Sequence, residues 1–192
     1  MNKYVKVMFG TTSGAKSDFE YKLDEVNVSN NWNPTAESGK DFGGFNYATE
    51  DCILRWLHRG DTIYDVEVPN DAENLRIDGA TTIYRTNKII IKNPRKVDDE
   101  LALHFYKISN IPEKAYYKAL GVVSIMNYRK TAYAIINDKV NKNNITEVLE
   151  EWNDFISHGS KNDRKDLNVL VKEIDDLLNK IKEETLWTQL FI

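Results

Sequence analysis

The hydrophobic pattern changes its period near residue 96, and this change constrains the fold more than any other feature. Before it, apolar residues alternate with polar ones or form short β-branched runs between turn residues, which is typical of strands. After it, apolar residues recur every three or four positions, which is typical of helices. The sequence therefore predicts an α+β protein. A small, mostly antiparallel sheet with one or more helices is expected over residues 1–96, and an all-helical module packed on it over 97–192.

The elements of the first half are bounded by turn residues. Thr49 is expected to cap a short helix that Gly60 ends, because glycine commonly follows the last turn of a helix. Asn93 and Pro94 are expected to end the last strand. The predicted strands cover residues 4–9, 45–48, 62–68, 74–77 and 82–92.

The helices of the second half are marked by capping residues and by apolar stripes. Asp98 is a predicted N-cap, and Pro112 fits the first turn of the next helix. Further helices are expected over residues 129–140 and 146–155, and a last one from about residue 163 onward.

Composition excludes several classes of protein. The 26 Lys and Arg against 30 Asp and Glu give a net charge of −4, which does not favour a polyanion as partner. A single cysteine, Cys52, excludes an intrachain disulfide and a cysteine-cluster metal site. The three histidines are far apart, so no metal ligand set is expected. No apolar run is long enough for a membrane span or a signal peptide, and we expect a soluble, cytoplasmic protein.

A basic run over residues 84–96, with five positive charges and no acid, allows two interpretations. Its side chains could contact the phosphates of a nucleic acid. Alternatively, its lysines could prevent an apolar edge strand from pairing with other chains. Lys88 and Lys92 flank an Ile triplet on one strand face, and the net charge is negative, so we favour the protective role and consider nucleic acid an unlikely partner. The candidate nucleic-acid residues are Arg85, Lys88, Lys92, Arg95 and Lys96.

Two carboxylates lie on one face of a predicted strand. Asp65 and Glu67 are two residues apart, which places their side chains about 6–7 Å from each other. Such a pair can share a proton or bind a cation, but alternation of polar and apolar faces explains it equally well.

The last helix carries a long apolar stripe. Its residues need a cover, which is either the core of this chain or another subunit. The candidate interaction surface consists of Leu170, Ile174, Leu177, Ile181 and Trp187.

Two stretches resemble the ADP-ribosyltransferase superfamily. Residues 8–13 resemble its first strand, and residues 41–50, followed by a Trp-bearing helix and the strand 64–69, are similar to its second motif. The resemblance implies NAD as cofactor, with Thr11 and Tyr47 binding it, and Glu67 together with Tyr47 as catalytic residues.

Two positions depart from the motifs of that superfamily. The His of the first strand falls on Phe9, which cannot hydrogen-bond a ribose. The strand 88–92 carries no carboxylate, which leaves Glu67 or a loop residue such as Glu100 as the acid. Over the whole chain, the sequence is similar to a family of bacterial and large DNA viral proteins without an assigned activity. The likeness lies in residues 44–57, 59–69, 87–94, 99–102 and 138–142. That likeness bears on fold and boundaries only.

Three hypotheses follow. The leading one is a non-catalytic interaction domain on a degenerate ADP-ribosyltransferase-like scaffold, without cofactor, which binds a protein partner or forms a homo-oligomer through the last helix. The alternative is a mono-ADP-ribosyltransferase that uses NAD with a rearranged site. The third is a nucleic-acid-binding accessory protein.

Overall fold

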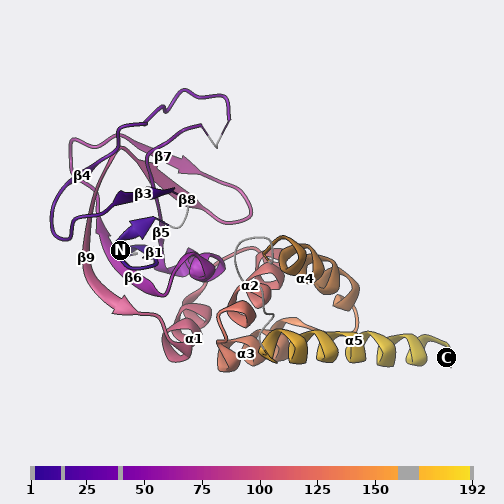
Figure 1. Cartoon of the computed structure of the whole chain (residues 1–192). Coiled ribbons are helices and arrows are strands. Elements are labelled where there is room, and N and C mark those ends of the chain that lie inside the picture. The colour runs from indigo at the N-terminus through magenta and orange to yellow at the C-terminus, as the bar shows by residue number, and fades with distance from the viewer. Residues whose placement is uncertain (1–2, 14–15, 39–40, 160–168, 191–192) are drawn as a thin grey trace.

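The computed structural model describes residues 3–13, 16–38, 41–159 and 169–190 of the chain (Figure 1). Its main sheet has seven strands in the order β4-β9-β6-β1-β5-β8-β7, and neighbouring strands pair antiparallel. The strands of this sheet and of a separate hairpin, β2-β3, are β1 (Tyr4–Met8), β2 (Thr12–Ser13), β3 (Lys16–Glu20), β4 (Asn27–Val28), β5 (Phe45–Thr49), β6 (Thr62–Glu67), β7 (Asn74–Ile77), β8 (Ile83–Thr86) and β9 (Lys88–Lys96).

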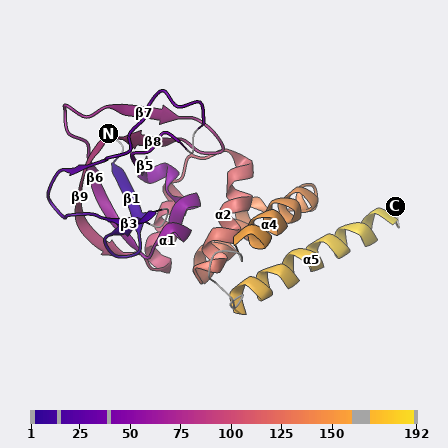
Figure 2. The ribbon, with the colours of Figure 1, turned by 45° about the horizontal axis from the view of Figure 1, so that its top comes forward.

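Helices make up the second half of the chain, so the predicted α+β class is confirmed. Asp98 accepts a hydrogen bond from the Leu101 backbone N–H at 2.9 Å and caps the first helix as expected. Figure 2 shows the last helix extending beyond its neighbours toward the C-terminus. The helices are η1 (Glu50–Cys52), η2 (Leu54–Arg59), α1 (Asp99–Ile108), α2 (Glu113–Ile125), α3 (Arg129–Lys139), α4 (Ile145–Gly159) and α5 (Val169–Leu190).

One continuous core joins the sheet to the helices. Val5 and Val7 of β1 belong to the same buried cluster as Leu57 of η2, Phe105 of α1 and Leu120 of α2. Because β1 lies in the middle of the sheet, the helices cover its central strands. Burial of this much apolar surface is the main stabilising contribution to the fold.

The opposite face of the sheet has its own core, which is rich in aromatic rings. Tyr47 and Tyr84 stack with their ring centroids 5.3 Å apart, and Phe19 and Tyr21 pack edge-on at 4.9 Å. Side chains alternate across a strand, so each strand contributes to both cores. The buried members of this aromatic core are Met8, Tyr21, Phe45, Tyr47, Tyr64, Ile89 and Ile91.

The helix expected after Thr49 differs from the prediction in its type. Two short 3₁₀ helices form there, and the Thr49 side chain makes no capping bond. The buried Leu54 and Leu57 are three residues apart, and three residues make one turn of a 3₁₀ helix. Gly60 ends η2 as expected, but with an extended backbone, φ 175°. It is needed because a Cβ there would lie 2.0 Å from the Met8 carbonyl carbon.

The strand expected over residues 82–92 is two strands. The buried Thr86 hydroxyl donates to the Lys88 carbonyl oxygen at 2.9 Å and accepts from the Lys88 N–H, so the chain turns there. The second strand, β9, then continues past Pro94 to Lys96. Asn93 adopts a positive φ of 48°, and the register shifts beside it between Ile63 and Asp65. The prediction that Asn93 and Pro94 end the strand was therefore wrong, because a β-bulge absorbs them.

Candidate anion-binding site

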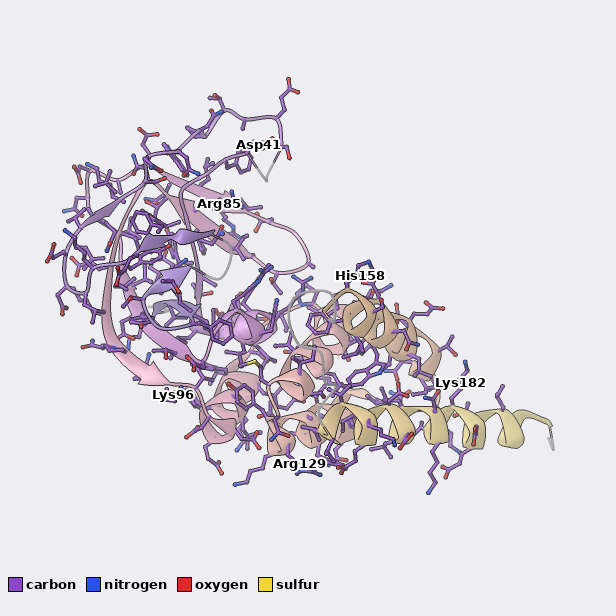
Figure 3. All side chains as sticks on the ribbon, viewed as in Figure 1. Asp41, Arg85, Lys96, Arg129, His158 and Lys182 are labelled. Atoms are coloured by element: carbon purple, nitrogen blue, oxygen red, sulfur yellow. The ribbon has the colours of Figure 1, made fainter. Side chains whose placement is uncertain are left out.

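A cavity of about 290 Å³ lies where η2 meets strands β1, β5 and β8. Aliphatic side chains form part of its wall, and an indole and three cationic side chains complete it. Figure 3 shows Arg85 among the strands, away from the helices that carry Arg129, His158 and Lys182. The lining residues are Val5, Lys6, Val7, Asn46, Tyr47, Ala48, Ile53, Trp56, Arg59, Ile83 and Arg85.

The cavity lies beside a place where the sheet opens. β1 pairs with β5 only at Tyr4 and Val5, although it pairs with β6 from Val5 to Met8. Beyond Val5, the Lys6 ammonium crosses the opening and donates to the Asn46 carbonyl oxygen at 2.7 Å. A side-chain bond thus replaces the backbone ladder at this point.

Lys6 is a buried cation. Its side chain is 7% exposed, and its ammonium lies 5.2 Å from the centre of the Tyr21 ring. Burial and the nearby charge of Arg85 lower the pKa of Lys6 to about 7. Near neutral pH the Lys6 amine therefore exchanges between its charged and neutral forms.

Arg85 and Asn46 face each other across strands β8 and β5. The Arg85 guanidinium donates through Nη1 to the Gly43 carbonyl oxygen at 3.3 Å. Burial lowers the pKa of Arg85, but an arginine remains cationic at neutral pH. Arg85 Nε and Asn46 Oδ1 are buried and have no hydrogen-bond partner within the described part of the chain. Unsatisfied buried polar atoms destabilise a fold and need a reason, such as a role in binding.

Trp56 forms an aromatic wall with cations beside it. The Arg59 guanidinium lies 5.9 Å from the centre of the Trp56 ring system, and the Arg55 guanidinium lies 5.1 Å from it. The indole N–H donates to Thr81 Oγ1 at 3.2 Å, which fixes the orientation of the ring. The ring therefore offers apolar surface to the cavity, while Arg59, which lies over the ring, supplies positive charge beside it.

Acids do not balance the charge of this site within the part of the chain that the structure describes. No Asp or Glu is among the described lining residues. Within residues 3–13, 16–38, 41–159 and 169–190, no carboxylate forms an ion pair with Lys6, Arg59 or Arg85. This contrasts with the rest of the sheet, where cations are paired. The arrangement suits a small molecule that carries negative charge.

Sequence reasoning missed most of this site. Arg85 was singled out only as a nucleic-acid contact, and Tyr47 only as part of an NAD site. Lys6 lies between the buried Val5 and Val7, and a lone lysine within a buried strand was the available signal. No local pattern marks the other residues, because they meet only where η2 packs against the sheet. These residues are Asn46, Trp56 and Arg59.

The residues predicted to bind NAD and catalyse transfer do not converge. The Tyr47 hydroxyl donates to Asn74 Oδ1 at 2.9 Å within the aromatic core. Glu67 alternates with Val66, which packs on that same core, so the carboxylate points to the opposite face. Thr11 lies near the β2-β3 hairpin and bonds Glu20 at 3.5 Å. Tyr47 lines the cavity, whereas Thr11, Glu67 and Glu100 do not.

Ionisation of Tyr47 is also unfavourable. Burial and the neighbouring Tyr4 and Tyr84 raise the pKa of Tyr47. Its phenol is therefore neutral near pH 7 and is not a base there.

Each carboxylate of the Asp65–Glu67 pair has its own cationic partners. Glu67 pairs with Lys92 at 2.6 Å, and Asp65 pairs with Lys3 and Arg95, both at 2.7 Å. Burial opposes ionisation of Asp65, but these partners, with a hydrogen bond from Asn93, outweigh it and lower the pKa of Asp65. The structure therefore gives the two acids separate partners in place of a shared proton.

The basic run is largely neutralised. Lys88 pairs with Asp71 at 2.5 Å, Lys92 with Glu67 at 2.6 Å and Lys96 with Asp61 at 2.6 Å, while Arg95 pairs with Asp65. Arg85 instead lines the cavity. The edge-strand interpretation holds only in part, because β9 pairs with β6 along its length but with β4 only at Lys88 and Ile89. These side chains therefore do not form a continuous, unpaired basic surface for nucleic acid.

The apolar stripe of α5 is covered mainly by the chain itself. Leu170 and Ile174 are fully buried in the main core, and Leu177 and Ile181 are partly buried against it. The Trp187 side chain lies outside the described residues. The stripe could be covered by the core of this chain or by another subunit. From Leu170 to Ile181 it packs against the chain's own core.

Comparison with protein-family models, with curated proteins and with solved structures finds no match for this chain. The resemblance to ADP-ribosyltransferases therefore stays a prediction. Among the described residues, no three His, Cys, Asp or Glu side chains are placed to hold a metal ion. None of the described helices has the length and apolar character of a membrane span.

Proposed function

We propose that this protein binds a small organic anion in the cavity between η2 and strands β1, β5 and β8. One observation carries the proposal: Lys6, Arg59 and Arg85 line one cavity, and none of the described residues that line it carries a carboxylate. Of these three cations Lys6 is buried, Arg85 is half-buried and Arg59 is exposed. Burial of the Lys6 charge without a counter-charge destabilises the fold, and a bound anion offsets that penalty.

Size and wall chemistry narrow the ligand further. Binding cavities for small molecules usually measure roughly 300–1,000 Å³, so about 290 Å³ is at the lower end. This space suits one ring system with a charged group better than a dinucleotide such as NAD. Trp56, Val5 and Ile83 offer apolar contact to the ring.

Replacement of Arg85 tests this function directly. We expect the Arg85→Gln variant to bind aromatic phosphates and carboxylates about 10–100-fold more weakly, because a charge-assisted hydrogen bond contributes about 1.5–3 kcal/mol. The affinities are measured by isothermal titration calorimetry, together with the shift of the melting temperature at saturating ligand.

Arg76→Gln is the matched control. Arg76 lies on β7, next to β8, and its exposed side chain pairs with Asp78 at 2.9 Å, outside the cavity. Equal affinities of the Arg76 and Arg85 variants would contradict the proposal.

Protein interaction remains a second proposal, restricted to the far end of α5. The helix extends past its neighbours in both ribbon views (Figures 1 and 2), and Leu186 is 51% exposed there. An interaction surface on this helix would have to use that end, because the stripe from Leu170 to Ile181 packs against the core.

A further inference from the structure

Among the side chains that the structure describes, none provides a counter-charge for Lys6. Its ammonium is bonded to a neutral carbonyl oxygen of Asn46 and lies near the Tyr21 ring. Arg85 on β8 is the charged group that acts on it, and it repels the ammonium. Other titratable groups around the opening are phenols from the aromatic core, Tyr47 on β5 and Tyr64 on β6. On the η2 side the cavity carries a further cation, Arg59.

This setting makes the charge of Lys6 responsive to a ligand. Burial and Arg85 lower the pKa of Lys6 to about 7, so above that pH the amine of the empty protein is mostly neutral. An anion in the adjacent cavity favours the charged form. Binding then transfers a proton from solvent to Lys6 Nζ, and no other bond changes.

The cations also indicate how much negative charge the ligand carries. A phosphate monoester carries about −1.5 to −2 at pH 7, whereas a carboxylate carries one charge. Arg59 and Arg85 alone match a dianion, and a protonated Lys6 adds a third charge beside them. The planar guanidinium fork suits phosphate oxygens, and the Trp56 ring suits a flat substituent.

We propose that the cavity takes the phosphate monoester of a small planar group and that Lys6 takes up a proton when this dianion binds. The proposal rests on the anion-binding function above and specifies its ligand class. It implies that affinity for the phosphate falls as the pH rises above neutrality, because protonating Lys6 then becomes more costly.

Calorimetry of the full chain tests the proposal with three probes of similar size: phenyl phosphate, phenyl sulfate and benzoate. At pH 8 phenyl phosphate is a full dianion, since the second pKa of a phosphate monoester is near 6, while the other two are monoanions. We expect phenyl phosphate to bind about tenfold or more tightly than either. Titrations in buffers of different ionisation enthalpy should show uptake of close to one proton at pH 8, and much less at pH 6.

Two variants assign the proton to Lys6. Lys6→Met should bind phenyl phosphate without proton uptake and more weakly. The Lys6→Arg variant keeps a permanent positive charge at this position, so it should also bind phenyl phosphate without taking up a proton. If Lys6→Met does not fold, Lys6→Arg alone tests whether Lys6 is the group that takes up the proton. Proton uptake that persists in either folded variant would overturn the role of Lys6.

The outcomes separate this proposal from the function on which it rests. Equal affinity for the three probes, without proton uptake, would overturn the dianion proposal and leave the anion-binding function in place. Binding of none of the three at millimolar concentration would contradict both.

Discussion

At the scale of single residues, the burial of Lys6 links the stability of the protein to pH. A lysine is rarely fully buried without a carboxylate partner, because its charge must leave water. Here burial and Arg85 lower the pKa of Lys6 from 10.5 to about 7. Between about pH 7 and 10 the unfolded chain therefore holds a proton on Lys6 that the folded chain has lost. The contribution of Lys6 to stability therefore rises with pH across this window, since Lys6 binds more protons in the unfolded state.

The Lys6→Met variant tests this linkage. Below pH 7 Lys6 is charged in both the folded and the unfolded state, so the full penalty of a buried charge is present. We expect Lys6→Met to be more stable than the natural chain there, on the order of 1–4 kcal/mol. The advantage should shrink as the pH rises toward 10. Denaturant unfolding at pH 6 and pH 9 measures it.

Lys22→Met provides the control for the same substitution at an exposed site. Its side chain is 73% exposed, and it makes only a 3.8 Å ion pair with Glu25. The change in stability caused by Lys22→Met should therefore be about the same at pH 6 and pH 9. A loss of stability in Lys6→Met of the same size at both pH values would contradict the linkage.

At the scale of elements, the position of η2 shapes the site. Trp56 and Arg59 belong to η2, and Gly60 lets its end lie against β1. A Cβ at residue 60 would lie 2.0 Å from the Met8 carbonyl carbon and 2.1 Å from its oxygen. Backbone atoms cannot give way as a flexible side chain can, so η2 would have to move away from β1.

Gly60→Ala therefore should affect both stability and binding. We expect a loss of about 1–3 kcal/mol of stability, as for other cases of overpacking, and weaker binding of phenyl phosphate. Denaturant unfolding and calorimetry measure the two effects. Gly79→Ala is the control, because a Cβ at residue 79 has nothing within 4 Å. Similar behaviour of the two variants would show that this close approach does not hold η2 in place.

Local patterns predicted most elements but few of the contacts between them. Alternation predicted the strand β1, and capping predicted the start of α1 at Asp98. The 3–4 spacing of apolar residues predicted the five helices α1 to α5 that follow Asp98. The turn at Thr86 did not, because it depends on a buried hydroxyl that replaces backbone partners. The place of β9 inside the sheet depends on the pairing of Asn27 and Val28 with it, which no local pattern shows.

The candidate site was harder to predict for the same reason. Lys6, Asn46, Trp56 and Arg85 come from four different elements and meet only through tertiary packing. The resemblance to ADP-ribosyltransferases directed attention to Glu67 and Tyr47, which point to opposite faces of the sheet. Alternation along a strand predicts the face of the sheet to which each side chain points. It does not predict where a cavity forms, because that depends on how the helices pack on the sheet.

At the scale of the whole molecule, the two faces of the sheet have separate cores. Helices cover one face, and aromatic side chains fill the other. The cavity lies beside the opening between β1 and β5, where η2 joins the helical layer. Lys6 crosses that opening and bonds the Asn46 carbonyl oxygen, so the residue proposed to respond to the ligand lies where the strand ladder is interrupted.

The indole N–H signals of the tryptophans offer the most direct test of the central claim, which is that the cavity binds a small anion. The chain has four tryptophans. Trp56 lines the cavity, and its Nε1 donates to Thr81. Trp32 Nε1 donates to Glu73 and Trp152 Nε1 to Asp175, and none of these four residues lines the cavity. Each signal therefore reports on a different place.

The measurement is a ¹H–¹⁵N correlation NMR titration of the full chain with phenyl phosphate, with the indole signals assigned by Trp→Phe variants. We predict that the Trp56 signal shifts in a saturable manner, while those of Trp32 and Trp152 stay in place. A Trp56 signal that does not move at millimolar phenyl phosphate, or a larger shift at Trp32 or Trp152, would contradict the account.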